Sequence, residues 1–209
     1  ARYANKPITL SFASGDETKT LPPPTIINAD NSGHEATHTL LTSVKRVFIA
    51  CKHQDLPEVI NDLKQWLPDN ATLMPALNGL CHLPQLREAF PEHKIIPLTI
   101  MYNAQRTGVL EAQLTTSPLI YIDGDDNELL SALNASGMIA KQGSLTIARG
   151  KLLLNLNNAI GALTNSTFRD VMLSKPHRKL ALAVFDEAMC VFQATKLEVN
   201  VPVPVPWWV

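Results

Sequence analysis

The stretch VFIACKHQDLPEVINDLKQWLPDNATLMPALNGL, residues 47–80, decides the fold class. It opens with an apolar run that ends at Cys51, which is typical of a strand buried on both faces. Pro57 then lies near the start of a helical pattern, and a second apolar run covers residues 71–77. Residues 83–90 are predicted to form another short helix. This strand–helix–strand–helix order predicts an α/β fold with a largely parallel sheet and helical crossovers.

The rest of the chain divides into a part with strands and a part without them. Further strands are predicted at 7–12, 95–102, 109–114 and 117–122, and residues 126–136 form a helical pattern with an acidic first turn. From about residue 143 the pattern is helical only, with helices expected around 145–165, 166–174 and 176–196. We therefore predict a sheet domain over 1–142 and a helical domain over 143–209. The Val-Pro tail at 201–208 can form polyproline II, and we expect a connector or a packed terminal arm there.

Composition and charge exclude several classes of function. The 209 residues carry a formal net charge of -1 with no basic stripe, which argues against nucleic acid as a partner. No apolar run approaches the roughly 20 residues that a membrane-spanning helix needs. Cys51, Cys81 and Cys190 are odd in number and lie far apart, which argues against a disulfide framework and against a structural zinc site. These features favour a reducing, cytoplasmic compartment.

The segment GKLLLNLNNAIGAL, residues 150–163, combines an apolar helical pattern with an unusual polar stripe. On an α-helix Lys151, Asn155 and Asn158 fall within a sector of about 60°, whereas Asn157 points elsewhere. One interpretation is the solvated side of a surface helix. The other is the wall of a site that holds and protonates a small polar ligand, because amides and one ammonium in an apolar surround suit that task.

Two further polar residues follow apolar runs of the predicted sheet. Lys52 comes directly after the first run of the opening stretch, and Asn78 follows the second. Ligands of open α/β sheets bind at the carboxyl ends of the strands, so both are candidate ligand contacts. The alternatives are an ordinary exposed lysine and a plain Asn-Gly turn.

Taken together, these residues resemble the ketopantoate reductase family, also called 2-dehydropantoate 2-reductases. Its members show an apolar strand ending in VKA, a second ending in QNG, and a helix reading KLxxN with another Asn seven or eight residues past the Lys. Here the first reads CKH and the second LNG, while Lys151, Asn155 and Asn158 fit the helix pattern. The resemblance covers most of the chain in the same order.

The resemblance implies a fold and a reaction. The fold is a Rossmann-like domain that binds NADP(H), followed by a helical domain like the C-terminal domain of 6-phosphogluconate dehydrogenase, which binds substrate and forms homodimers. The reaction is the NADPH-dependent reduction of 2-dehydropantoate, or a related 2-keto acid, in pantothenate and coenzyme A biosynthesis. By resemblance Lys151 donates the proton and Asn155 and Asn158 bind substrate, while Lys52 contacts the cofactor and Asn78 contacts both molecules. No metal is implied.

The family's glycine-rich turn, GxGxxG, is absent from the nine glycines of this sequence. The first residues are similar to the segment after the family's second strand, which would place Arg2 near the 2′-phosphate of NADPH. The family's later C-terminal segment is absent as well, so we expect these residues to be either a portion of a longer chain or a truncated protein. Without the family's first strand, the strand ending near Lys52 would have an unpaired apolar edge. A second hypothesis is a reductase-like protein without catalysis, retained as a binding or dimerising module.

Two other motifs suggest metals. HEATH at 34–38 matches the HExxH pattern of zinc metallopeptidases, but it follows a loop-like stretch and no supporting third ligand is evident. DGDDNE at 123–128 is rich in acidic residues but lacks the full calcium-loop pattern. We interpret it as a turn that caps the following helix.

Overall fold

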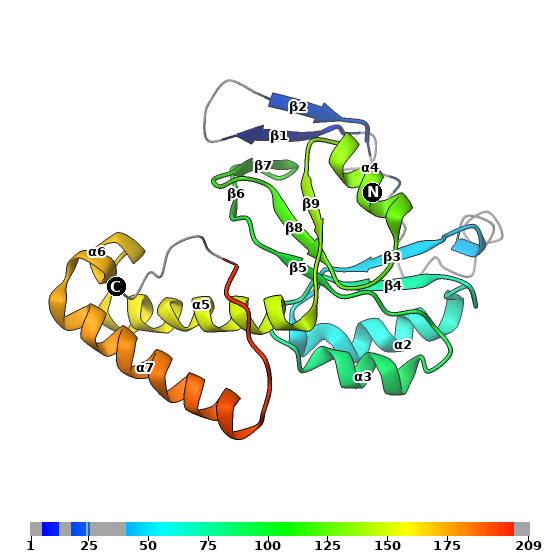
Figure 1. Ribbon diagram of the computed structural model, residues 1–209. Coiled ribbons are helices and arrows are strands. Elements are labelled where there is room, and N and C mark those ends of the chain that lie inside the picture. Colours follow the sequence, from blue (N-terminus) through cyan, green and yellow to red (C-terminus); the bar gives the residue numbers. More distant parts are fainter. Residues whose placement is uncertain (1–5, 13–17, 24, 26–40, 203–209) are drawn as a thin grey trace. The chain divides into compact units, whose positions relative to one another are not determined.

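The computed structural model of the chain describes residues 6–12, 18–23, 25 and 41–202 (Figure 1). Backbone contacts divide the chain into two compact units. The sheet unit comprises Ala1–Leu77 and Cys81–Gln142, and the helical unit comprises Asn78–Leu80 and Gly143–Val209. Arg2 and the HEATH motif at 34–38 lie outside the described residues.

The opening stretch folds in the predicted order. Strands β3 (Arg46–Ile49) and β4 (Thr72–Pro75) pair in parallel, with Ile49 opposite Pro75. Between them lie the short 3-10 helix η2 (His53–Asp55) and helix α2 (Leu56–Trp66), and helix α3 (His82–Ala89) follows. Pro57 lies in the first turn of α2, where its missing N–H costs nothing. In the part of the chain that the structure describes, β3 pairs with β4 alone.

The remaining strands form two further sheets. One has the order β5 (Leu98–Ile100), β8 (Leu119–Ile122), β9 (Ile139–Gln142), and helix α4 (Asn127–Ala135) connects the parallel strands β8 and β9. The other has the order β2 (Thr18–Leu21), β1 (Ile8–Phe12), β7 (Glu111–Leu114), β6 (Ala104–Arg106). Over the described residues the pairs β1–β7, β3–β4 and β8–β9 are parallel, and the pairs β1–β2, β5–β8 and β6–β7 are antiparallel. The α/β fold followed by a helical region is thus confirmed, with mixed pairing in place of a largely parallel sheet.

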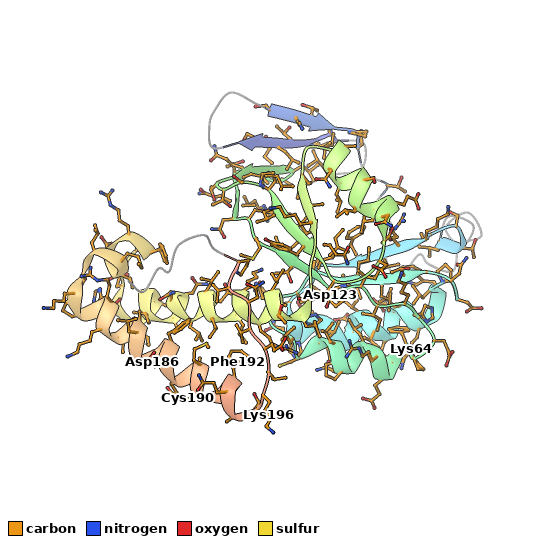
Figure 2. The ribbon with its side chains drawn as sticks, in the orientation of Figure 1. Lys64, Asp123, Asp186, Cys190, Phe192 and Lys196 are labelled. Carbon is orange, nitrogen blue, oxygen red and sulfur yellow. The ribbon has the colours of Figure 1, made fainter. Side chains whose placement is uncertain are left out.

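The helical unit contains α5 (Leu145–Thr164), α6 (Phe168–Leu173) and α7 (Lys175–Ala194), close to the three predicted helices. Thr167 and Asp170 form a reciprocal capping box at the start of α6, and the Ser174 side chain caps α7. Figure 2 shows Cys190, Phe192 and Lys196 near the end of α7, where the chain turns back. None of the described helices is long and apolar enough to cross a bilayer.

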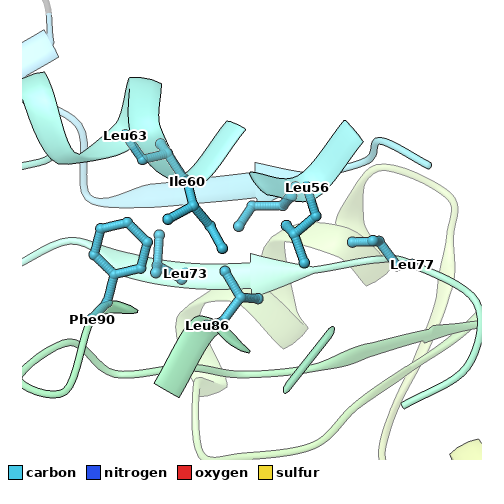
Figure 3. Close-up of a cluster of buried hydrophobic side chains, with 8 residues drawn as sticks. Leu56, Ile60, Leu63, Leu73, Leu77, Leu86 and Phe90 are labelled. Carbon is cyan, nitrogen blue, oxygen red and sulfur yellow. The ribbon is translucent and has the colours of Figure 1, made fainter. Parts of the chain in front are cut away.

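Two apolar clusters hold the sheet unit together. The first joins α2, β3, β4 and α3 (Figure 3), through Ile49, Leu56, Ile60, Leu63, Leu73, Leu77, Leu86 and Phe90. The second joins β4, β5, β8, β9 and α4 through Met74, Ile96, Leu98, Ile120, Ile122, Leu129 and Ala140. Burying one Leu or Ile side chain contributes about 1.5–3 kcal/mol. Because Leu73 and Met74 point to opposite faces of β4, this strand belongs to both clusters and fixes the position of the turn that follows it.

Candidate active site

Helix α5 carries the polar stripe found in the sequence. Its buried residues recur at helical spacing and so form one face, which comprises Ile147, Gly150, Leu153, Asn157 and Ile160. This helix packs against α6 and α7 within the helical unit. It ends at Thr164, and the next residue, Asn165, adopts the left-handed conformation with φ 49° that favours Asn and Gly.

The residues of the stripe differ in exposure. Lys151 and Asn155 are partly buried, whereas Asn158 is exposed. Burial lowers the pKa of the Lys151 ammonium from its ordinary value, because the charged form loses hydration. A lysine with a lowered pKa gives up its proton more readily, which suits a general acid. The stripe therefore combines one partly buried ammonium with an amide one helical turn away.

Asn157, which helix geometry places outside the stripe, lies on the buried face of α5. It is 5% exposed, and its Nδ2 donates a weak hydrogen bond of 3.4 Å to the Leu154 carbonyl. It is thus a polar residue within the packing of the helical unit, and no pattern in the sequence assigns it a function.

Lys52 and Asn78 occupy equivalent positions after their strands. Lys52 follows Ile49 by three residues and Asn78 follows Pro75 by three, and Ile49 pairs with Pro75. Both side chains are exposed. Asn78 begins a turn in which Gly79 has φ +80°, as the Asn-Gly pair predicts. Asn78–Leu80 belong to the helical unit together with Lys151, whereas Lys52 belongs to the sheet unit.

Two neighbouring histidines, His53 of η2 and His82 of α3, were not anticipated. His82, the first residue of α3, is 2% exposed and its Nδ1 has no hydrogen-bond partner among the residues that the structure describes. Burial lowers the pKa of His82, and the nearby His53 lowers it further. The His53 Nε2 lies 3.4 Å from the Gln85 Nε2. No sequence pattern marked His82, because a single His beside an Asn-Gly turn carries no apolar periodicity that would indicate burial.

The acidic turn at 123–128 serves as a helix cap, as predicted. The Asp126 side chain accepts a hydrogen bond of 2.9 Å from the Leu129 N–H and so caps α4. Arg46 of β3 donates to both Asp126 oxygens at 2.8 and 2.9 Å and to Glu128 at 2.8 Å. Among the residues that the structure describes, no three His, Cys, Asp or Glu side chains are grouped to hold a metal ion.

Comparison with known proteins places the chain in a family. The model of the ketopantoate reductase PanE/ApbA family matches residues 2–126, and the model of its C-terminal domain matches residues 145–206. The chain belongs to the ketopantoate reductase family. The second match contains α5 and therefore the whole Lys151 stripe.

Curated ketopantoate reductases are distant relatives of the chain. The 2-dehydropantoate 2-reductase of Streptococcus pyogenes serotype M1 is 23% identical over 164 residues, which cover 74% of this chain and 53% of the relative. An identical match is found with the same enzyme of serotype M3. The chain thus spans about half the length of the curated relatives it matches.

Solved structures share the fold at low identity. The PanE/ApbA family ketopantoate reductase of Ralstonia eutropha JMP134 aligns with a TM-score of 0.76 at 16% identity, over 92% of this chain and 62% of that protein. The dimeric ketopantoate reductase of Staphylococcus aureus aligns with a TM-score of 0.68 at 17% identity, over 98% and 65%. D-mandelate dehydrogenase, solved with NADH and anilino(oxo)acetate, has a TM-score of 0.73 at 16% identity, over 93% and 63%.

Proposed function

We propose that the chain carries the substrate-protonating part of an NADPH-dependent reductase that converts 2-dehydropantoate, or a related 2-keto acid, to the 2-hydroxy acid. The observation that carries this proposal is the half-buried Lys151 with its lowered pKa, on the helix that the family model matches. Negative charge develops on the carbonyl oxygen of a keto acid when C2 is reduced, and a positioned ammonium can protonate that oxygen. Lys151 supplies such a group.

The amides around Lys151 have binding roles in this proposal. Asn155 lies one turn from Lys151 and donates to the hydroxyl or carboxylate of the substrate. Asn158 is exposed and lies one turn further along, where it contacts the more distant end of the substrate. Asn78 shares the helical unit with them and contributes a fourth polar side chain.

The residues after β3 and β4 fit the polar portions of a nicotinamide dinucleotide. The Lys52 ammonium and the Asn78 amide are exposed at the carboxyl ends of parallel strands, where α/β folds bind such molecules. The ammonium suits phosphate and ribose oxygens, and the amide suits a carboxamide or ribose hydroxyl. When bound, NADPH supplies the hydride.

Substitution of Lys151 tests the proposal. In a protein that carries both regions matched by the family models, residues 2–126 and 145–206, Lys151→Ala is expected to lower kcat by about 10²–10⁴. The Kd for NADPH should stay nearly unchanged. Lys179→Ala removes an exposed ammonium from α7 and serves as the matched control, with wild-type kinetics expected. Unchanged turnover in the Lys151 variant would refute the role of this lysine.

Substrate and cofactor choice is tested on the same protein. We expect reduction of 2-dehydropantoate with NADPH to exceed reduction of an aromatic 2-keto acid with NADH. The reverse preference would favour a function closer to that of D-mandelate dehydrogenase. The alternative of a non-catalytic binding module predicts that neither pair of substrates is turned over while the fold remains intact.

The proposal also covers the cellular compartment and the oligomeric state. All three cysteines, Cys51, Cys81 and Cys190, are free thiols, consistent with work in a reducing cytoplasm. We also propose that the protein forms a homodimer, by analogy with the dimeric ketopantoate reductase of Staphylococcus aureus. Light scattering of the purified protein decides between monomer and dimer.

A further inference from the structure

The chain after α7 runs along the first turns of α5. Residues 198–202, which we call the strap, follow the turn at the end of α7 and cross α5 (Figure 1). The Asn200 N–H donates to the Thr146 carbonyl at 3.0 Å, and the Arg149 Nη1 donates to the Glu198 carbonyl at 2.9 Å. The strap is therefore bound to α5 through its own backbone N–H and carbonyl groups. Any residue type would offer the carbonyl, and any except proline would offer the N–H.

Gly150 makes this close approach feasible. A Cβ at this position would collide with the Asn200 carbonyl oxygen and would lie 2.6 Å from the Asn200 carbonyl carbon and 2.8 Å from the Val201 Cα. These atoms belong to the backbone and cannot rotate away as a flexible side chain could. Glycine in a helix interior costs about 1 kcal/mol relative to alanine. The contact with the strap gives a physical reason for a glycine in the second turn of α5.

The contact with the strap lies next to the candidate proton donor. Thr146, Arg149 and Gly150 meet the strap, and Lys151 is the next residue along the helix. The first turn of a helix frays readily, because its N–H groups lack intrahelical partners. The Ser144 side chain forms no capping hydrogen bond to the α5 backbone. The strap holds this end of the helix in its place.

We propose that Gly150 is a positioning residue for Lys151, because it admits the strap that clamps the helical turn from which Lys151 projects. This inference rests on the proposed function of Lys151 and extends it to two segments with no assigned role. A displaced strap lets the start of α5 fray, and Lys151 then gains hydration. Arg149 and Glu198 are the charged residues at the contact, and burial alone accounts for the lowered pKa of Lys151. The pKa of Lys151 should therefore rise toward 10.5, the value for an unperturbed lysine.

Paired variants separate the contact from general destabilisation. Gly150→Ala places a methyl group against the strap, although alanine alone would favour the helix. Asn200→Pro removes the N–H that bonds Thr146, and Asn200→Ala retains it as the matched control. We expect Gly150→Ala and Asn200→Pro to increase amide hydrogen exchange in residues 145–151, and Asn200→Ala to leave it unchanged. In the double variant the two effects should fall short of additivity, because both act through the strap.

The titration of Lys151 gives a readout that does not depend on turnover. Modification of lysines by an amine-directed reagent is followed by mass spectrometry as a function of pH, with exposed Lys179 as the reference. In Gly150→Ala the pH midpoint for Lys151 should move upward while that for Lys179 stays fixed. In an active preparation the alkaline limb of kcat should move in the same direction, and kcat should fall about tenfold or more as the proton donor loses its alignment.

Two outcomes of these experiments would contradict the positioning role of Gly150. Unchanged exchange in 145–151 on Gly150→Ala would show that the strap does not clamp this turn. Increased exchange with an unshifted Lys151 midpoint would show that the strap stabilises α5 without positioning Lys151. Either result overturns the inference. A shifted midpoint in a protein that reduces no 2-keto acid would uphold the positioning role and refute only the proposed reaction.

Discussion

His82 is a buried histidine whose Nδ1 has no hydrogen-bond partner within the described part of the chain, and it lies at the positive end of a helix dipole. Both features disfavour the imidazolium form, and the neighbouring His53 adds to the penalty. The folded-state pKa of His82 therefore lies below its ordinary value of 6.5.

Stability should fall in mild acid because of this residue. Below pH 6.5 the unfolded chain binds a proton at His82 that the folded chain refuses, so the free energy of unfolding decreases as the pH drops toward the folded-state pKa. Above pH 6.5 the residue contributes no pH dependence. Urea denaturation at pH 7.5 and 5.5 should show this decrease in the natural protein and a smaller one in His82→Gln. If the free energy of unfolding decreases equally in the two proteins, the acid sensitivity arises from another residue.

At the scale of elements, one arginine joins β3 to α4. Arg46 is 23% exposed at its side chain and Asp126 is 12% exposed, so the bidentate pair is partly shielded from water. The Arg46 hydrogen bonds hold the pKa of Asp126 below its ordinary value. The stabilisation is therefore present above pH 3.8 and is lost as the pH falls through the folded-state pKa.

Loss of the arginine should weaken this junction. Arg46→Ala leaves the Asp126 carboxylate with its cap to Leu129 but without its cation, at an expected cost of about 1–3 kcal/mol in the free energy of unfolding. Glu128→Gln is the matched comparison and should have a much smaller effect, because Glu128 is 75% exposed at its side chain. Chemical denaturation of both variants gives the comparison, and equal effects would contradict the dominant role of Asp126.

The end of α7 includes a lysine in an unfavourable backbone conformation. Lys196 has φ 54°, a region in which side chains other than Asn, Asp and Gly are strained. Lys196→Gly should raise the free energy of unfolding by about 0.5–1 kcal/mol, because glycine adopts this conformation without strain. The larger entropy that glycine loses on folding offsets part of the gain. Thermal unfolding measures the gain. Asn165→Gly, just past the end of α5, is the control and should change the unfolding midpoint little, because asparagine tolerates the same conformation. A loss of stability in Lys196→Gly would show that the Lys196 side chain contributes more through packing than it costs in strain.

At the scale of the whole molecule, long periodic segments were predictable and short ones were not. The helices at 145–164 and 175–194 and the strand–helix–strand order from residue 46 follow from apolar periodicity, which reports burial directly. Strands β2, β6 and β9 have three or four residues with few buried side chains, so they leave no apolar pattern and depend on pairing with distant strands.

The candidate site was predictable in part for a similar reason. The shared side of Lys151 and Asn155 follows from helix geometry alone. Their exposure, the buried His82 and the contact at Gly150 depend on which distant segments pack beside them, and periodicity holds no information on that. The roles assigned to Lys52, Asn78, Lys151, Asn155 and Asn158 remain predictions, and the Lys151→Ala variant tests the role of the lysine.

The chain passes between its two units three times, after Leu77, after Leu80 and after Gln142. The helical unit is therefore discontinuous in sequence, and a stretch excised from Gly143 onward would lack its own Asn78. A protease cut between Gln142 and Gly143 would give two fragments of which the first retains three residues that pack as part of the second. Reconstitution from such fragments, in the manner of a split enzyme, would have to restore this loop before any pocket that uses Asn78 could form.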